Sequence, residues 1–226
     1  MRKIFSDYKI KLSDEQLKKF EVYYDLLVFY NGKFNITAIT EKEDVYLKHF
    51  VDSVLGVEKI CGKTLIDVGS GGGFPAIPIK IMREDTRLTM LEATGKKCDF
   101  LNTVVKELKL ENVEVINSRA EDKAKDPLFR ESFDCCSARA VARLNTLCEY
   151  CMPFVKIGGT FVAYKGDAEE EIKEANSAIK TLGGRLVDAF FYELGGAKRT
   201  LVSIEKIIAT DKKYPRGNGK ERKNPL

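Results

Sequence analysis

One stretch, residues 64–79, constrains the fold of this chain more than any other. It reads TLIDVGSGGGFPAIPI: an apolar run containing Asp67 is followed by a glycine cluster, and Pro75 then opens a second apolar run. Glycine lacks a Cβ atom and tolerates positive φ, so the backbone can turn sharply and approach a ligand closely. Proline suits the first position of a helix, where its missing N–H would be unpaired anyway. The stretch therefore predicts a strand, a tight loop and a helix, the corner at which open α/β sheets bind nucleotides.

Strand and helix patterns alternate after this loop. We predict strands at 64–68, 87–91, 113–117, 133–137 and 160–164, with helices at 75–82, 96–108, 144–152 and 168–182. Such alternation is typical of parallel strands joined by right-handed crossovers. Two further strand patterns, at 185–194 and 200–208, are separated by a link too short for a crossover, so they must pair antiparallel. Five parallel strands followed by an antiparallel C-terminal hairpin make an α/β, Rossmann-like plan, that of the class I S-adenosylmethionine-dependent methyltransferase fold.

The front of the chain has no strand pattern. Ser13 can cap a helix over 13–30 that ends at Asn31-Gly32, and Thr40 can cap a second helical region over roughly 43–60. We therefore predict three parts, which are an N-terminal helical cap at 1–60, a methyltransferase domain at 61–210 and an irregular, basic C-terminal tail at 211–226.

Length, hydropathy and charge set the broad class. The 226 residues suffice for one α/β domain with a modest extension. No apolar run approaches the roughly 20 residues that span a bilayer, and no signal-peptide core opens the chain, so we expect a cytoplasmic protein without a membrane partner. The six cysteines fit reduced, buried thiols, and no metal site is predicted. The net charge of +4 lies in residues 205–226, where seven basic residues face three acids; this suggests a polyanionic partner, although a solvated terminus explains it equally well.

The glycine loop does not complete the dinucleotide-binding fingerprint. Gly69 and Gly71 are present, but Phe74 stands where a third glycine would allow close packing of helix on strand. A Walker-type phosphate loop needs a lysine and a serine or threonine after the glycines, and none follows. Asp67 would repel a pyrophosphate but suits a ligand that carries an ammonium and a sulfonium group. These residues favour S-adenosylmethionine as the cofactor.

Two more sites along the chain agree with that cofactor. Glu92 follows the second strand, 25 residues after the acid of the first, where a carboxylate can accept hydrogen bonds from the paired hydroxyls of a ribose. Ala93 and Thr94 would then pass along the sugar, and Ala120 and Glu121, after the third strand, would flank the adenine. Glu92 alone is explained as well by a solvated acid at a strand end, but three correctly spaced features together favour the cofactor.

The fourth strand, where such enzymes often place their chemistry, runs into Arg139. The Asn-Pro-Pro-aromatic motif of exocyclic-amine methyltransferases is absent, and Cys135 and Cys136 precede the strand end, which favours buried core residues over nucleophiles. The single histidine, His49, is better explained as a packed residue of the cap than as a general base. An acceptor that needs no deprotonation fits, and guanine N7 with O6 offers the acceptor pair that arginine reads. Arg139 is thus the candidate catalytic residue, with a structural ion pair as the alternative.

Seven short motifs along the chain, taken together, carry a resemblance to a known family. They are NITAI at 35–39, DS at 52–53, DVGSGGGFP at 67–75, IP at 77–78, SARA at 137–140, KG at 165–166 and YPR at 214–216. In these motifs, and over nearly its whole length, the chain resembles the glucose-inhibited division protein B family, the bacterial small-subunit ribosomal RNA (guanine-N7) methyltransferases. The resemblance implies methyl transfer from S-adenosylmethionine to N7 of a guanine in 16S ribosomal RNA. It places at the cofactor Gly69, Phe74, Glu92, Ala93, Thr94, Ala120, Glu121 and Arg139. The chain departs from the family at Ala76, where relatives usually have glycine, and at Ala138, which separates Ser137 from Arg139.

An RNA substrate requires basic contacts and an unpaired or splayed-out base, so the cap is expected to shape the entrance. We predict RNA contacts from Lys165, Arg199, Lys212, Lys213, Arg216, Lys220, Arg222 and Lys223, although a solvated surface explains single tail lysines equally well. The expected partner is small-subunit ribosomal RNA or the 30S subunit, and the protein is expected to be a monomer. The alternatives are a methyltransferase of the same fold that acts on a small molecule or a protein, and a non-catalytic RNA-binding protein.

Overall fold

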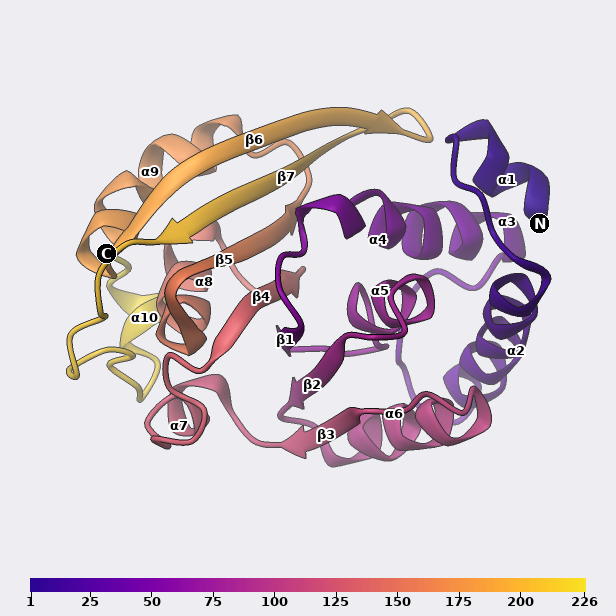
Figure 1. Ribbon diagram of the computed structural model, residues 1–226, viewed down its shortest axis with the longest axis horizontal. Helices are drawn as coiled ribbons and strands as arrows, with labels where there is room; N and C mark the ends of the chain where they lie inside the picture. Colours follow the sequence, from indigo (N-terminus) through magenta and orange to yellow (C-terminus); the bar gives the residue numbers. More distant parts are fainter.

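A seven-stranded sheet forms the centre of the computed structural model, which describes all 226 residues (Figure 1). The strands are β1 (Thr64–Val68), β2 (Arg87–Glu92), β3 (Val113–Asn117), β4 (Phe133–Arg139), β5 (Val155–Lys165), β6 (Gly184–Leu194) and β7 (Ala197–Lys206). Their order is β3-β2-β1-β4-β5-β7-β6; β1 to β5 pair parallel, and β7 pairs antiparallel with both β5 and β6. The predicted plan of five parallel strands and an antiparallel hairpin is confirmed.

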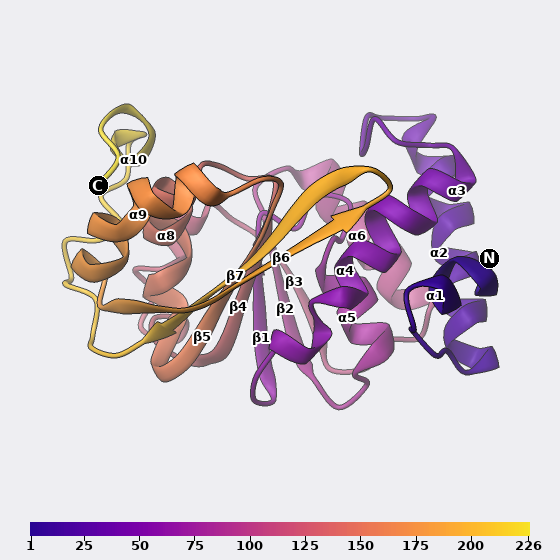
Figure 2. The same ribbon diagram turned by 90° about the horizontal axis from the view of Figure 1, so that it is seen from above.

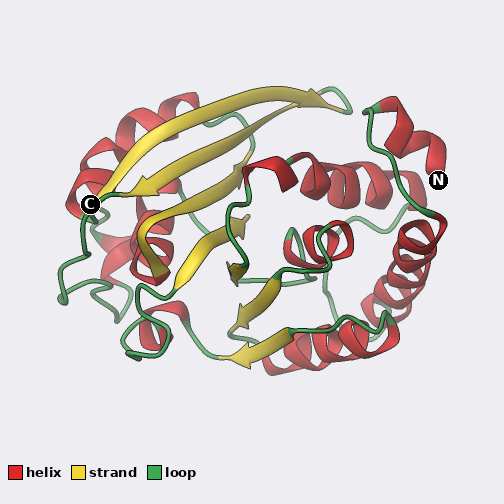
Figure 3. Cartoon of the chain, viewed as in Figure 1, coloured by secondary structure: helices red, strands yellow, loops and turns green.

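The sheet has helices on both faces, in three layers (Figures 2 and 3). The helices are α1 (Arg2–Asp7), α2 (Asp14–Asn31), α3 (Lys42–Val45), α4 (Asp52–Leu55), α5 (Ala76–Met82), α6 (Gly95–Glu107), α7 (Ala120–Lys123), α8 (Leu144–Cys151), α9 (Glu169–Thr181) and α10 (Lys220–Lys223). Three short π or 3₁₀ segments join them, at Tyr46–Val51, Val57–Lys59 and Met152–Phe154. The elements α1 to α6 lie on one side of the sheet, and α8 and α9 on the other (Figure 2). Two buried apolar clusters correspond to these two faces.

The helices before β1 largely follow the sequence prediction. Ser13 caps α2 in a complete capping box, because its side chain accepts from the Gln16 backbone N–H while the Gln16 side chain accepts from that of Ser13. The second helical region begins after Glu41, so the cap predicted at Thr40 is wrong. That region is interrupted by a π-helix at Tyr46–Val51, a widened turn that is frequent at functional sites. Neither the π-helix nor α1 has a signature in the sequence.

The N-terminal helices share one hydrophobic core with the sheet. Phe20, Tyr23 and Phe50 are fully buried in a cluster that also contains Phe74 of the glycine loop and Leu65 of β1. Burial of such large apolar side chains supplies most of the favourable free energy of packing. The cap is thus held against the same face as α5 and α6, and a boundary at residue 60 stays a prediction.

The C-terminal tail is packed against the domain, so the solvated terminus considered as an alternative does not describe it. Arg216 pairs with Glu149 of α8, which is 1% exposed at its side chain, with 2.7 Å between Nη2 and Oε2. Tyr214 is buried, and its carbonyl accepts a hydrogen bond from Arg130 at 2.9 Å. Sequence composition described the tail as polar, but an arginine facing a buried carboxylate is a tertiary feature that composition does not reveal.

The cysteines are all free thiols, as predicted. Five are buried, and Cys61 is exposed. None of the helices combines the length and the apolar character needed to cross a membrane.

Candidate active site

The glycine loop lies at the carboxyl end of β1, where the strand order reverses between β1 and β4. The backbone N–H groups of Gly69 and Ser70 both donate to the Leu91 carbonyl of β2, at 2.8 and 3.1 Å. Gly69 and Gly71 have φ of +71° and +56°, which a residue with a Cβ atom rarely adopts. A Cβ atom at Gly69 would also lie 2.7 Å from a methyl group of Val141. Pro75 directly precedes α5 as its N-cap, one position before the one predicted.

Three cavities follow one another along the ends of the strands. The loop cavity, of 400 Å³, is lined by the glycine loop together with Thr37, His49, Glu92 and Arg139. The Tyr150 cavity, of 290 Å³, shares Gly69 and Val141 with it. The Arg199 cavity, of 350 Å³, shares His49, Arg139 and Ala140 with it. Because they share wall residues, the three cavities adjoin one another, and together they are called the trough here. Arg139 stands where the loop cavity meets the Arg199 cavity.

The Tyr150 cavity collects residues from three predicted positions. Ala93 follows β2, and Ala120 and Glu121 follow β3; all three line this cavity. The sequence predicts Ala93 beside the sugar and Ala120 and Glu121 beside the adenine of the cofactor, and these contacts stay predictions. The backbone N–H of Thr94 instead donates to Glu92 at 2.8 Å, and Thr94 lines none of the three cavities. Chain direction in parallel strands brings these ends together, which is why spacing along the sequence located them.

Glu92 binds the glycine loop to β2. It is 7% exposed, and its Oε2 accepts from the backbone N–H of Gly71 at 2.9 Å. Its Oε1 accepts from Thr94 N–H at 2.8 Å. Each carboxylate oxygen has a second lone pair, so Glu92 can hold the loop and still accept a hydrogen bond from a ligand in the loop cavity.

Asp67 lies beneath the loop and does not line the cavity, in contrast to the direct cofactor contact predicted. Its side chain accepts from Ser137 Oγ at 2.6 Å through Oδ1, while Oδ2 has no partner. Burial raises the pKa of Asp67 to about 6, partly offset by the hydrogen bond from Ser137. Asp67 can therefore act on a cationic ligand only through its charge and through the position of the loop above it.

Phe74 is an aromatic support for the site. It stacks on Tyr23 with ring centroids 5.4 Å apart and on His49 at 4.4 Å, and its ring lies 5.0 Å from the guanidinium carbon of Arg139. Only 6% of the residue is exposed, so it contributes an edge to the loop cavity while its ring faces are covered by protein. Phe74 stands where the dinucleotide fingerprint has its third glycine, and here its ring supports His49 and Arg139.

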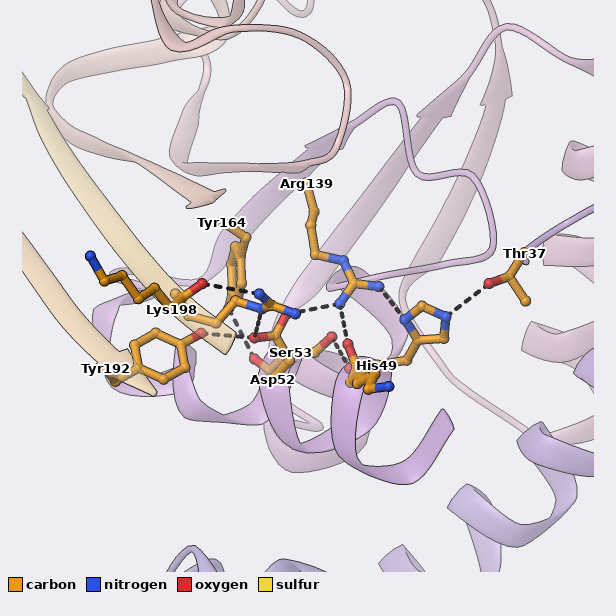
Figure 4. A network of polar contacts seen from close by, with 10 residues as sticks. Thr37, His49, Asp52, Ser53, Arg139, Tyr164, Tyr192 and Lys198 are labelled. Atoms are coloured by element: carbon orange, nitrogen blue, oxygen red, sulfur yellow. Dashed lines mark hydrogen bonds and ion pairs between the residues drawn. The ribbon is translucent and has the colours of Figure 1, made fainter. Parts of the chain in front are cut away.

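Arg139 is the centre of a polar network that crosses from β4 to the N-terminal helices (Figure 4). Its Nη1 donates to Asp52 Oδ2 at 3.0 Å and to the Lys48 carbonyl at 3.2 Å, and its Nη2 donates to His49 Nδ1 at 3.0 Å. A guanidinium has five N–H groups, so one on Nε and one on Nη2 remain without a protein partner. The structural ion pair considered as an alternative exists, yet Arg139 also lines two cavities.

His49 is part of this network and cannot serve as a base. Because arginine only donates, Nδ1 of His49 must be unprotonated, and Nε2–H then donates to Thr37 Oγ1 at 2.9 Å. Burial and the neighbouring Arg139 lower the pKa of His49 to about 3. The imidazole is therefore neutral at physiological pH with both nitrogens engaged. The sequence made His49 a poor candidate for a general base and a packed residue of the cap, and it missed that His49 lines two of the cavities.

Asp52 is a buried residue of the network that the sequence prediction did not assign to the site. It is 4% exposed, and besides Arg139 it accepts from the Tyr192 hydroxyl at 2.9 Å through Oδ1. Arg199 of β7 approaches the same oxygen at 3.6 Å. Asp52 and Thr37 both fall in motifs that carried the family resemblance, and that was the one available sign of their importance.

The basic residues predicted for RNA separate into four groups. Lys165 and Arg199 line the Arg199 cavity, where Lys165 also pairs with Glu171 at 2.7 Å. Four tail lysines are exposed, namely Lys212, Lys213, Lys220 and Lys223. Arg216 is paired with Glu149, and its contact with RNA stays a prediction. Arg222 is exposed and lines the Tyr150 cavity.

Comparison with known sequences finds a family model and individual proteins that are similar to this chain. The GidB family model, described as rRNA small subunit methyltransferase G, matches residues 16–202. A Desulfitobacterium hafniense protein named Ribosomal RNA small subunit methyltransferase G is 46% identical over 220 residues, with 96% of this chain and 92% of that protein covered. A Clostridium botulinum protein of the same name is 47% identical over 232 residues, with 100% and 97% covered.

Solved structures agree with the fold at low sequence identity. A SAM-dependent methyltransferase from Aquifex aeolicus superposes with a TM-score of 0.55 at 19% identity, over 73% of this chain and 94% of that one. TYW2 from M. jannaschii, solved in complex with AdoMet, gives a TM-score of 0.54 at 16% identity, over 70% and 76%. The predicted methyltransferase fold is thereby confirmed.

Proposed function

Because the chain belongs to the GidB family of small-subunit ribosomal RNA methyltransferases, we propose that it transfers a methyl group from S-adenosylmethionine to N7 of a guanine in 16S ribosomal RNA. The observation that carries the choice of N7 is the trough itself. A loop cavity suited to the cofactor meets, at Arg139, a cavity lined by both cations and acids. Its three acids, Asp52, Asp167 and Glu171, are each held in an ion pair, and His49 has both nitrogens engaged, so none of them is free to act as a base.

The loop and Tyr150 cavities fit S-adenosylmethionine. The two cavities adjoin at Gly69 and Val141, the wall residues that they share. The Glu92 carboxylate at the loop suits ribose hydroxyls, and Ala120 and Glu121 suit the adenine. The orphaned carboxylate oxygen of Asp67 beneath the loop adds negative charge that favours a cationic ligand. When bound, the cofactor supplies a methyl group on a positively charged sulfur.

Guanine N7 carries a lone pair in its neutral form, so its attack on a methyl group releases no proton. The site then needs alignment of the reacting atoms and no general base. This requirement agrees with a His49 whose pKa is lowered to about 3 and whose two nitrogens are already engaged. An exocyclic amine would lose a proton during transfer, and the two acceptors beside Arg139, His49 and Asp52, are already engaged in hydrogen bonds.

Arg139 is proposed to hold the guanine through O6. N7 must stay free of hydrogen bonds, since its lone pair forms the new bond; the two unpartnered N–H groups of Arg139 are therefore available for O6 and a nearby oxygen. Methylation makes the guanine ring cationic. The Asp52 carboxylate, 3.0 Å from Nη1, balances the charge of Arg139, so that charge does not oppose the one that develops on the base.

Ribosomal RNA is the proposed substrate class, in the form of the 30S subunit or a precursor of it. Lys165 and Arg199 in the Arg199 cavity are placed to contact phosphates next to the target base. The four exposed tail lysines, Lys212, Lys213, Lys220 and Lys223, extend the basic surface. A monomer working in the cytoplasm, where ribosomes are assembled, is part of the same proposal.

Mass mapping of RNA fragments tests the function directly. Ribosomal subunits that lack the modification are incubated with the protein and methyl-labelled S-adenosylmethionine, and we expect a single guanine of small-subunit RNA to gain one methyl group at N7. Methyl transfer to a protein or to a small molecule, with none to RNA, would contradict the proposal and support a same-fold enzyme of another class.

The exchange of Glu92 for glutamine tests the cofactor assignment. A glutamine side chain has one acceptor oxygen, so it cannot receive both the Gly71 and the Thr94 N–H bonds, and its amide would face one of them donor to donor. We expect the dissociation constant for S-adenosylmethionine to rise about 10-fold or more in calorimetry. Glu114→Gln, an exposed residue of β3, is the matched control; equal affinities of Glu92→Gln and wild type would remove Glu92 from the site.

A further inference from the structure

The C-terminal turn, residues 217–223, forms part of the wall of the Tyr150 cavity. Gly219 and Arg222 line that cavity beside Ala120, Glu121 and Tyr150. In Figure 1 the turn, ending in α10, lies between α7 and α8, and α10 contacts α8. Residues about 100 positions apart in the sequence thus enclose one space, and that space is the proposed site of an adenine.

The turn is anchored from beneath by contacts with α8. Glu221 is fully buried; its backbone carbonyl accepts from Thr146 Oγ1 at 3.0 Å, and its side chain accepts from the backbone N–H of Gly217. The adjacent Arg216–Glu149 ion pair fixes the entry into the turn. A segment of mostly polar residues is therefore held in one conformation, which a merely solvated terminus would not require.

Arg222 is the one cationic side chain of the turn that reaches the cavity. It is exposed, makes no ion pair, and lies close to the hydroxyl of Tyr150 in the cavity wall. Burial raises the pKa of Tyr150, and the Arg222 guanidinium partly offsets that increase, which agrees with their closeness. A planar guanidinium can stack on a neutral aromatic base or donate to its ring nitrogens.

We propose that the C-terminal turn is a cofactor-binding element, in which Arg222 contacts the adenine of S-adenosylmethionine. The proposal rests on binding of that cofactor in the Tyr150 cavity. Because the turn docks on α8 and the ligand would touch both, docking of the turn and binding of the cofactor stabilise each other. The exposed Lys220 and Lys223 lie on the same turn, so cofactor binding also fixes two cations of the surface proposed for RNA.

Calorimetric titration of the full chain with S-adenosylmethionine and with S-adenosylhomocysteine tests the role of Arg222. We expect Arg222→Ala to raise both dissociation constants about 5- to 10-fold, since both ligands carry the adenine. Arg87→Ala, at an exposed arginine that lines none of the three cavities, should stay within about twofold of wild type. Unchanged cofactor binding by Arg222→Ala would remove Arg222 from the cofactor site and overturn the proposal. Absence of cofactor binding by the wild-type protein would instead overturn the proposed function.

Hydrogen exchange of the wild-type protein tests whether docking of the turn and binding of the cofactor stabilise each other. Amide protons of residues 217–223 should exchange more slowly when S-adenosylhomocysteine is bound, and unchanged exchange would contradict the coupling. Thr146→Val removes the hydroxyl that holds the Glu221 carbonyl and leaves the cavity wall intact. This variant should bind the cofactor about threefold more weakly, and wild-type affinity there would show that the anchor is irrelevant to the cavity.

Discussion

Alanine at position 139 is expected to lower methylation of small-subunit RNA about 100-fold or more, the range seen when a preorganised donor is removed from an active site. Arg139 stands at the junction of the loop and Arg199 cavities and contacts Asp52, His49 and the Lys48 carbonyl together. Its loss removes the donors proposed for O6 and leaves Nδ1 of His49 without its partner. Single-turnover transfer from labelled cofactor to ribosomal subunits measures the effect.

The fold should survive this substitution, because Asp52 keeps the Tyr192 hydroxyl and the nearby Arg199 as partners. Arg143→Ala provides the matched control: Arg143 is exposed, pairs with Glu174 and lines none of the three cavities. Cofactor affinity, measured separately, distinguishes loss of alignment from loss of binding. Wild-type turnover by Arg139→Ala would show that the arginine is only a structural ion pair.

Asparagine at position 67 is expected to change how the stability of the cofactor-free protein depends on pH. The pKa of Asp67 is raised from 3.8 to about 6, so the folded state prefers the protonated carboxyl. Stability from this preference is fully present below pH 3.8 and is lost as the pH rises through about 6. At pH 8 the wild-type protein therefore lacks about 2 to 3 kcal/mol that it has at pH 4, and asparagine, which does not titrate, lacks this dependence.

Thermal unfolding at pH 4 and pH 8 measures the effect as a difference between variants. The melting temperature of Asp67→Asn relative to wild type should be higher at pH 8 than at pH 4 by roughly 5 to 10 °C. The unpaired amide nitrogen left beside Ser137 shifts both values equally, so the change with pH is the informative quantity. Asp85→Asn, at an exposed position without an ion pair, should give a small difference at both pH values; an equally small one for Asp67→Asn would contradict the raised pKa.

Local sequence patterns located the scaffold of the site well. The glycine loop, the ends of β2 and β3 and the terminal residue of β4 were each predicted from short-range features, namely glycine spacing, strand periodicity and an acid or arginine at a strand end. Parallel strands then convert these separate positions into one edge of the sheet. Ser13 and its capping box were equally readable, since a cap depends on a few neighbouring backbone groups only.

Contacts between distant segments were beyond such patterns. His49 contacts both Phe74 and Arg139 because of the way the N-terminal helices pack on the sheet. No pattern of neighbouring residues in the sequence predicts that packing. Likewise Arg216 faces the buried Glu149, 67 residues earlier, and so a tail that reads as solvated is fixed to the domain although its lysines are exposed. In both cases the sequence indicated a residue that is merely packed or solvated, whereas the structure shows a specific partner from a distant part of the chain.

The π-helix at Tyr46–Val51 makes the number of residues in this segment as important as their chemistry. A widened turn holds one residue more than a regular α-helix of the same length. Deleting one residue here would restore a regular helix of the same length, so the residues on either side would keep their directions and the residues inside the turn would move. Among the latter are His49 and the Lys48 carbonyl, which both contact Arg139. Variation among natural or designed versions of this segment should therefore consist of substitutions, and insertions or deletions should be confined to the loops on either side.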